Sequence, residues 1–125
     1  MKKVISTTNA PAAIGPYSQA IEANGFLFIS GQLPINPADK LMPEDVKNQT
    51  VQVMKNIEAI LTAAGYTLDH VIKSTVLLAD IKDFAVMNEV YGQFYKTDCP
   101  ARAAYQVANL PLGAKVEIET IAYKK

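Results

Sequence analysis

A single arginine, Arg102, stands out among the charged residues of this 125-residue chain, because every other basic residue is a lysine. It lies between Pro100 and Val107, in a segment that otherwise has the composition of a half-buried strand. Lysine is sufficient for general surface charge, whereas arginine presents a planar, permanently charged fork that can bind a carboxylate or phosphate through two hydrogen bonds. Arg102 is therefore a candidate for holding an acidic ligand, and a structural ion pair with a glutamate is the competing interpretation.

Two glutamates near the end of the chain could complete such a site. Glu117 and Glu119 alternate with Val116 and Ile118, so a strand would place both carboxylates on one face. The separation from Arg102, on the preceding predicted strand, is compatible with antiparallel pairing or near-neighbour placement. The glutamates then either neutralise the arginine, or one of them positions a water beside a ligand that the arginine holds.

Other polar positions could border a cleft. Asn88 lies within the apolar face of a predicted helix, where its amide needs a hydrogen-bond partner. Ser30 and Gly31 end a predicted strand and could present a hydroxyl and backbone amides to a ligand. Tyr17 follows a rigid Gly-Pro turn and could cover a pocket. Each position also has an ordinary structural explanation, namely core hydrogen bonding, a strand end or packing.

Several familiar kinds of catalytic site are missing from the sequence. His70 is the only histidine, and its place after Asp69 at a strand edge predicts a surface or capping role, so no Ser-His-Asp triad can be built. Cys99 is the only cysteine, which excludes an internal disulfide and a cysteine-rich zinc site. No phosphate-binding loop is present. We therefore expect neither a metal nor a cofactor.

Charge and hydropathy exclude further classes of function. The formal net charge is zero and no lysine run or arginine cluster is present, so we expect no nucleic-acid partner. The basic start of the chain lacks a long apolar segment, and no apolar run approaches the length that spans a membrane. We expect no membrane association and a soluble, cytoplasmic protein.

Periodicity divides the chain into strands and two long helices. Apolar residues at helical spacing predict one helix from about Glu44 to Ala64 and another from about Asp83 to Lys96. Asn24 and Gly25 predict a two-residue hairpin turn. Strands are expected at about residues 4–5, 17–23, 26–31, 71–79, 101–107 and 115–123.

The order of these elements predicts a single α+β domain over residues 1–125. Both helices should cover one face of a mixed sheet of about six strands, which leaves the other face uncovered. Because the predicted strand over residues 71–79 is apolar on both sides, we expect the uncovered face to pack against another subunit.

Short segments distributed along nearly the whole chain together resemble the reactive-intermediate deaminase (Rid, YjgF-like) family. Each motif is weak alone, but their order and spacing make the combination specific. Arg102 places the resemblance with the archetypal subgroup that carries an arginine at this position. The matching segments are residues 9–20, 29–34, 64–65, 80–84, 88, 100–102, 110–111 and 116–119.

The resemblance implies a chorismate-mutase-like α+β fold that assembles as a homotrimer with clefts between neighbouring subunits. It implies hydrolysis of reactive 2-imino and enamine acids, such as 2-iminopropanoate and 2-iminobutanoate, to 2-oxo acids and ammonia. These species leak from pyridoxal-phosphate dehydratases that act on serine and threonine, so the implied role is control of metabolite damage. No metal or cofactor is implied.

The resemblance also implies roles for individual residues. Arg102 would clamp the substrate carboxylate, and Glu117 would orient or deprotonate the attacking water. Many members have a cysteine where this chain has Ala104, and a backbone carbonyl there could still accept a hydrogen bond from the departing nitrogen. The substrate-binding residues implied alongside Arg102 are Tyr17, Ser30, Gly31, Asn88 and Ala104.

Three other functions stay open at this point, and one of them, a chaperone-like role, has no sequence signal for or against it. The same trimer could hold a 2-oxo acid without turnover, as a regulatory module. Some relatives are described as endoribonucleases or translation inhibitors, but the chain has neither a basic surface nor a candidate histidine base for RNA cleavage.

Overall fold

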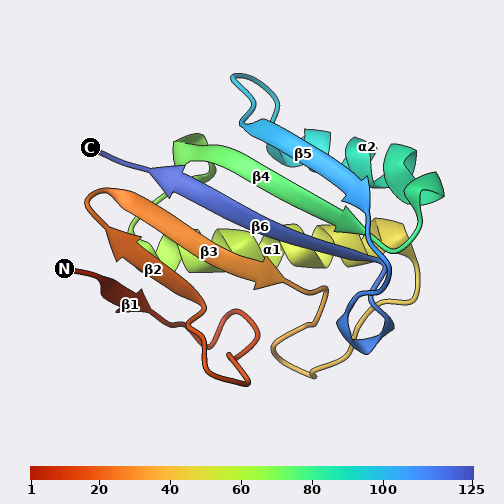
Figure 1. The fold of residues 1–125 in the computed structure, drawn as a ribbon, viewed down its shortest axis with the longest axis horizontal. Helices are drawn as coiled ribbons and strands as arrows, with labels where there is room; N and C mark the ends of the chain where they lie inside the picture. The colour runs from red at the N-terminus through yellow and green to blue at the C-terminus, as the bar shows by residue number, and fades with distance from the viewer.

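The computed structural model describes all of residues 1–125 as a six-stranded sheet with two helices on one side (Figure 1). The strands are β1 (Lys3–Ile5), β2 (Ala20–Ala23), β3 (Phe26–Gln32), β4 (Val71–Leu78), β5 (Ala101–Gln106) and β6 (Val116–Tyr123). The helices are α1 (Val46–Ala64) and α2 (Phe84–Phe94). The predicted α+β architecture is confirmed, and the elements begin and end close to the predicted residues.

The strand order across the sheet is β1-β2-β3-β6-β4-β5. All neighbouring pairs are antiparallel except β4 and β5, which run parallel. Parallel neighbours need a crossover connection, and α2 supplies it. Because β4 lies between β5 and β6, the antiparallel pairing of the Arg102 and Glu117 segments, one of the predicted arrangements, does not occur.

Local sequence explains where α1 begins and ends. The Asp45 side chain accepts a hydrogen bond from the backbone N–H of Asn48 at 3.0 Å and caps the first turn. Gly65 adopts φ = 82° and ends the helix, a left-handed conformation that costs glycine little. No helix of the protein has both the length and the apolar character that crossing a membrane requires.

The hydrophobic core lies between the helices and one face of the sheet. Along β4 and β6, alternate side chains such as Val76 and Ile118 are fully buried toward the helices. The opposite face, which we call the uncovered face, lies toward the viewer in Figure 1. Phe28, Tyr105 and Tyr123 point to it and are 47%, 49% and 40% exposed.

Candidate functional site

Arg102 lies on the edge strand β5 and points to the helix side of the sheet, where α2 holds it. Phe84, Asn88 and Tyr91 follow one another at i, i+4 and i+7 and therefore share one face of α2. Arg102 Nη1 donates a hydrogen bond to Asn88 Oδ1 at 2.8 Å. The guanidinium carbon lies 5.4 Å from the centroid of the Phe84 ring and 4.9 Å from that of Tyr91, within the range of cation–π attraction.

This arrangement restrains the guanidinium and leaves most of its donors free. A guanidinium carries five N–H groups, and Asn88 accepts from only one nitrogen. The Arg102 side chain is only partly buried, so solvent and ligands can reach it. Its remaining donors can therefore bind a ligand carboxylate in a bidentate geometry. Asn88 does have a hydrogen-bond partner, which is Arg102, but its side chain is exposed, so the prediction that it lies within a buried apolar face is wrong.

Glu117 lies on the other side of the sheet. In the strand register, Arg102 is opposite the buried Ser74, which faces the helices, whereas Glu117 is opposite Leu77, which faces away from them. Strand spacing and rise place the Cα atoms of Arg102 and Glu117 roughly 14 Å apart, on opposite faces. The interpretation of Arg102 as the ion-pair partner of Glu117 or Glu119 is therefore wrong within one chain.

Gly31 makes the room that the Glu117 carboxylate occupies. A Cβ atom built on Gly31 would overlap Oε2 of Glu117 and lie 3.0 Å from its Cδ. The φ angle of Gly31 is not in the left-handed region, so the need for glycine here is one of space. Gly31, one of the two candidate residues predicted at the end of this strand, therefore borders Glu117 directly.

The environment of Glu117 disfavours its charged form. Burial raises the pKa of its carboxyl above the ordinary value, and repulsion from Glu119 raises the pKa further. A raised pKa makes the carboxylate a stronger base, so it takes a proton from water more readily than an ordinary glutamate does. Its environment thus suits the general-base role that the resemblance implied.

A hollow of about 420 Å³ lies beside Glu119 on the uncovered face and includes Tyr17 and Ser30 in its lining. Tyr17 is 52% exposed, so its ring is free to contact a ligand or another chain. Ser30 Oγ donates a hydrogen bond to the Ser18 carbonyl at 2.6 Å, which fixes the hydroxyl and leaves its lone pairs as acceptors.

Ala104 contributes a backbone group at the free edge of the sheet. The N–H of Val107 donates to the carbonyl of Leu78 at 2.9 Å, so the backbone groups of Val107 point toward β4. Backbone groups alternate in direction along a strand, and those of Arg102 and Ala104 therefore point outward, where no further strand pairs with them. The Ala104 carbonyl is thus free to accept a hydrogen bond, while its side chain packs toward the core.

The structure separates the predicted site residues into two groups. The arginine group on β5 and α2 brings Arg102, Asn88 and Ala104 to one edge. The glutamate group on the uncovered face consists of Tyr17, Ser30, Gly31 and Glu117. Within one chain the structure does not bring the two groups together.

Sequence reasoning missed the contribution of Phe84 and Tyr91. Helical periodicity alone places both residues on the apolar face of the second helix and does not predict their contact with the only arginine. The available signal was the spacing itself, because it places the position 88 amide on one helix face with an aromatic residue four positions before it and another three after it.

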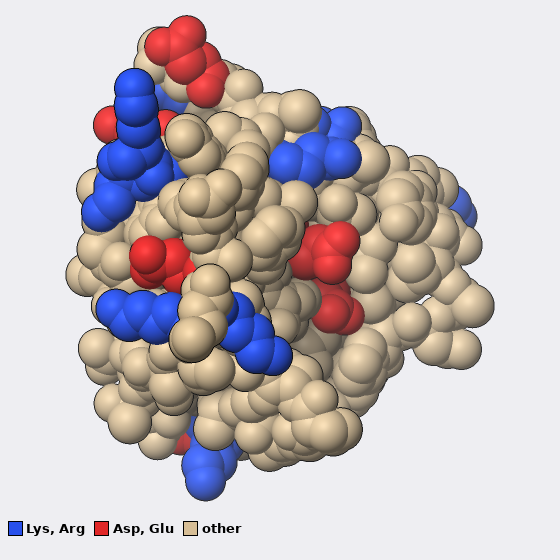
Figure 2. Space-filling view, turned by 60° about the vertical axis from the view of Figure 1, so that its left-hand side comes forward, with Lys and Arg blue, Asp and Glu red and all other residues tan.

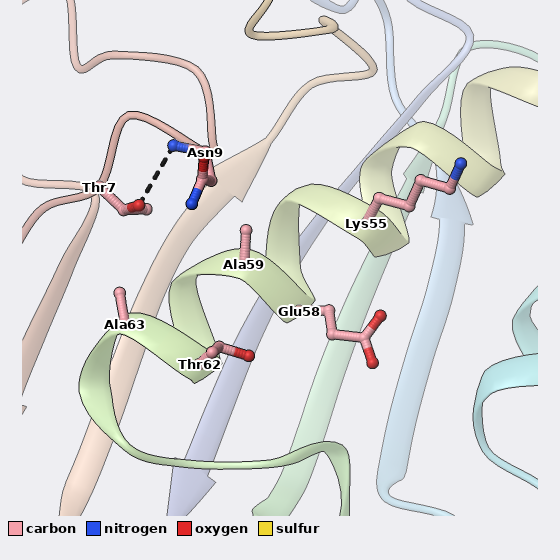
Figure 3. Close-up of a pocket in the computed structure, with 7 residues that line it drawn as sticks. All are labelled: Thr7, Asn9, Lys55, Glu58, Ala59, Thr62 and Ala63. Carbon is pink, nitrogen blue, oxygen red and sulfur yellow. Dashed lines mark hydrogen bonds between the residues drawn. The ribbon is translucent and has the colours of Figure 1, made fainter.

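Another hollow, of about 430 Å³, lies between the N-terminal loop and α1 (Figure 3). Thr7 and Asn9 border it from the loop, and the Asn9 N–H donates to Thr7 Oγ1 at 3.1 Å. Lys55 and Glu58 border it from α1, and in the figure their side chains point away from Thr7 and Asn9. None of the predicted site residues lies in its lining.

The charge distribution of one face and the position of the only histidine can be read from the structure. Figure 2 shows acidic and basic side chains interspersed over the visible face without an extended patch of one sign. The backbone N–H of Thr67 donates to His70 Nδ1 at 2.9 Å, so the only histidine caps a short 3₁₀ turn, as predicted.

The chain is similar to known proteins over nearly its whole length. The Ribonuc_L-PSP family, described as endoribonuclease L-PSP, matches residues 7–124. A RutC family protein of Pyrococcus horikoshii is 56% identical over 126 residues, which cover 100% of both chains. A mouse protein named 2-iminobutanoate/2-iminopropanoate deaminase is 52% identical over 123 residues, which cover 98% of this chain and 91% of the mouse protein.

A solved structure carries the same fold with a ligand. The crystal structure of E. coli TdcF with bound serine superimposes with a TM-score of 0.95 and 43% sequence identity, and the match covers 98% of this chain and 99% of TdcF.

Proposed function

The chain belongs to the endoribonuclease L-PSP (YjgF/Rid) family, and on that premise we propose that it hydrolyses reactive 2-imino and enamine acids to 2-oxo acids and ammonia. The observation that carries the proposal is the state of Arg102. Its guanidinium is held by Asn88 and two aromatic rings, and its remaining donors are free for a small carboxylate. The mouse relative, whose name states this activity, supports the substrate class.

We further propose that the working site lies between two subunits of a homotrimer. Arg102 and Glu117 cannot reach one small substrate from a single chain, because they occupy opposite faces of the sheet. The exposed aromatic side chains of the uncovered face favour burial against another copy. The arginine group of one subunit would then meet the glutamate group of its neighbour.

The proposed reaction adds water to a C=N bond. Arg102 binds the substrate carboxylate and fixes the position of the adjacent imine carbon. Glu117 takes a proton from a water molecule as its oxygen attacks that carbon, which gives a tetrahedral intermediate. Glu117 then returns the proton to the nitrogen. When the imine enters protonated, this leaves an ammonium group on the tetrahedral carbon. The C–N bond then breaks as the hydroxyl group gives its proton to Glu117 and becomes the carbonyl of the 2-oxo acid. The departing ammonia takes that proton from Glu117 and leaves as ammonium.

Two further residues have parts in this scheme. The outward-facing carbonyl of Ala104 accepts a hydrogen bond from the substrate nitrogen, a role that the alanine side chain does not alter. Tyr17 covers the cleft from the uncovered face, where it is half exposed in the single chain.

A coupled assay tests the activity directly. A pyridoxal-phosphate dehydratase acting on threonine supplies fresh 2-iminobutanoate, and the rate of 2-oxobutanoate release is measured. The wild-type protein should raise this rate and Arg102→Ala should not. Lys47→Ala, which removes an exposed positive charge on α1, is the matched control and should behave as wild type.

The same assay separates the proposal from its alternatives. A regulatory module would bind a 2-oxo acid in a manner that depends on Arg102 without accelerating imine hydrolysis. An endoribonuclease would cleave RNA whether or not Arg102 is present. Wild-type protein that leaves the rate of 2-oxobutanoate release unchanged would overturn the deaminase proposal.

Mixed trimers test the placement of the site between subunits. Arg102→Ala and Glu117→Gln chains should each be inactive alone. When they are co-assembled at random, about one quarter of the interfaces receive an intact arginine from one chain and an intact glutamate from its neighbour, so activity should reappear at about that level. A site within one chain would give no recovery.

A further inference from the structure

Four buried hydroxyl groups lie in the core directly behind Arg102 and have no hydrogen-bond partner in the protein. They belong to Ser74, Tyr91, Tyr95 and Thr120, whose exposed fractions range from 0% to 6%. A buried hydroxyl without a partner is costly, and native proteins seldom leave one unsatisfied. Four together in one region of a small domain require an explanation.

The strand register and the helix bring these hydroxyls together. Ser74 on β4 is opposite Thr120 on β6 and opposite Arg102 on β5, so the three residues form a row that faces the helices. Tyr91 lies on α2, and Tyr95 is the first residue after the end of this helix. The centroids of their rings are 4.8 Å apart. Tyr91 is also the ring that lies 4.9 Å from the Arg102 guanidinium carbon.

The hydroxyls do not satisfy one another. Ser74 approaches both tyrosine hydroxyls as a hydrogen-bonding neighbour, which lowers the pKa of each, but the distances and angles among the four oxygens do not meet the geometry of a formed hydrogen bond. Burial outweighs this influence and raises the pKa of both tyrosines, so both stay protonated and each offers a donor as well as an acceptor. The cluster therefore presents several donors and acceptors within one buried region.

We propose that Ser74, Tyr91, Tyr95 and Thr120 form an internal hydration site, and that the bound water fixes the Tyr91 ring against Arg102. An internal water makes two to four hydrogen bonds to buried polar groups, and the four unpartnered hydroxyls supply that number of partners. Tyr91 is then a positioning residue, which acts on the substrate carboxylate through the arginine. This last consequence rests on the proposed function, whereas the hydration site and the restraint of Arg102 do not.

Because Arg102 is the only arginine, its Nε–H group gives a single side-chain signal of its kind in a ¹⁵N NMR spectrum. The rate at which this proton exchanges with solvent measures how firmly the guanidinium is held. Tyr91→Phe keeps the ring and removes the hydroxyl, and it should raise the exchange rate by about fivefold, the factor expected for the loss of one hydrogen bond. Tyr66→Phe is the matched control, because the Tyr66 hydroxyl is also buried but donates to the Gly25 carbonyl far from Arg102.

A high-resolution crystal structure completes the test. The wild-type protein should show an ordered water within hydrogen-bond distance of at least two of the four hydroxyls, and Tyr91→Phe should lose or displace it. Hydroxyls that bond directly to one another with no water between them would overturn the proposal. So would an Arg102 signal that is unchanged in Tyr91→Phe, or one that changes equally in Tyr66→Phe. Neither measurement depends on deaminase activity, so failure of one proposal is distinguishable from failure of the other.

Discussion

At the scale of single residues, the contact between Gly31 and Glu117 can be tested with one methyl group. Gly31→Ala would place a Cβ atom in the space that the Glu117 carboxylate occupies. Since the backbone angle at position 31 is accessible to alanine, we expect the fold to persist while the carboxylate is displaced. Under the proposed function, kcat for imine hydrolysis should fall at least tenfold, because the attacking water loses its orientation.

The control for this substitution is Gly92→Ala, since a Cβ atom at Gly92 meets nothing within 4 Å. That variant should retain wild-type kcat. Equal losses in both variants would show that the added methyl group acts through general destabilisation and not through Glu117.

The raised pKa of Glu117 makes stability depend on pH in a defined direction. The folded protein binds the Glu117 proton more tightly than the unfolded chain does, so the free energy of unfolding falls as pH rises. The fall begins near the ordinary glutamate pKa of about 4.3 and ends above the raised value. Glu117→Gln removes this effect, so it should raise Tm relative to wild type at pH 7, and the gain should vanish near pH 4.

Activity should also depend on the ionisation of Glu117, but it should increase with pH, whereas the free energy of unfolding decreases. As a general base Glu117 must be ionised, so kcat should rise with pH through the pKa that this carboxyl has in the assembled site. Glu119→Gln removes the neighbouring charge that contributes to the shift and should move this rise to lower pH. A profile that is identical in wild type and Glu119→Gln would contradict the assignment of Glu117 as the base.

At the scale of elements, the crossover from β4 to β5 explains why α2 carries functional side chains. A parallel pair of strands needs a crossover, and α2 supplies it, packing beside α1 and contacting Arg102 near the start of β5. Val90 and Met87 are buried from this helix, while Asn88 stays exposed and reaches Arg102. The element that connects the strands thus also holds the arginine.

The ends of the elements were largely predictable, whereas their pairing was not. Hydrophobic period, the Asn24-Gly25 turn and the Gly65 stop are local signals, and they located the strands and helices. The insertion of β6 between β3 and β4 depends on contacts between residues far apart in the chain, for which a single sequence carries no local signal. The relation of Arg102 to Glu117 depended on that pairing, so periodicity could place each carboxylate on a face but could not place it relative to the arginine.

The helix stop at Gly65 gives a prediction at this scale. Gly65→Ala keeps the surrounding space open, since the nearest atom to the added Cβ would be Lys124 Nζ at 3.7 Å. Alanine pays a conformational cost at φ = 82°, so we expect a loss of about 1 kcal/mol in the free energy of unfolding. Urea denaturation of Gly65→Ala and wild type would measure it, and a change within experimental error would contradict the role of Gly65 as a left-handed cap.

At the scale of the whole molecule, the uncovered face should determine the oligomeric state. Phe28→Lys places a charge among the exposed aromatic side chains of that face, where burial against another subunit would leave it unpaired. We expect the mass in light scattering to fall from that of a trimer to that of a single chain, with the circular dichroism spectrum preserved.

Leu41→Lys provides the control for the oligomeric state, because Leu41 is 66% exposed in a loop outside the sheet. It should leave the mass unchanged. A Phe28→Lys protein that keeps the wild-type mass would contradict assembly through the uncovered face.

The placement of Arg102 and Glu117 on opposite faces also bears on when the protein can work. Under the proposed assembly, a newly made chain folds with both halves of a site and can use neither until it meets other copies. Specific activity should then decline on dilution below the dissociation constant of the trimer, although every chain stays folded. The abundance of the protein itself would set the onset of its activity, without an effector or a modification.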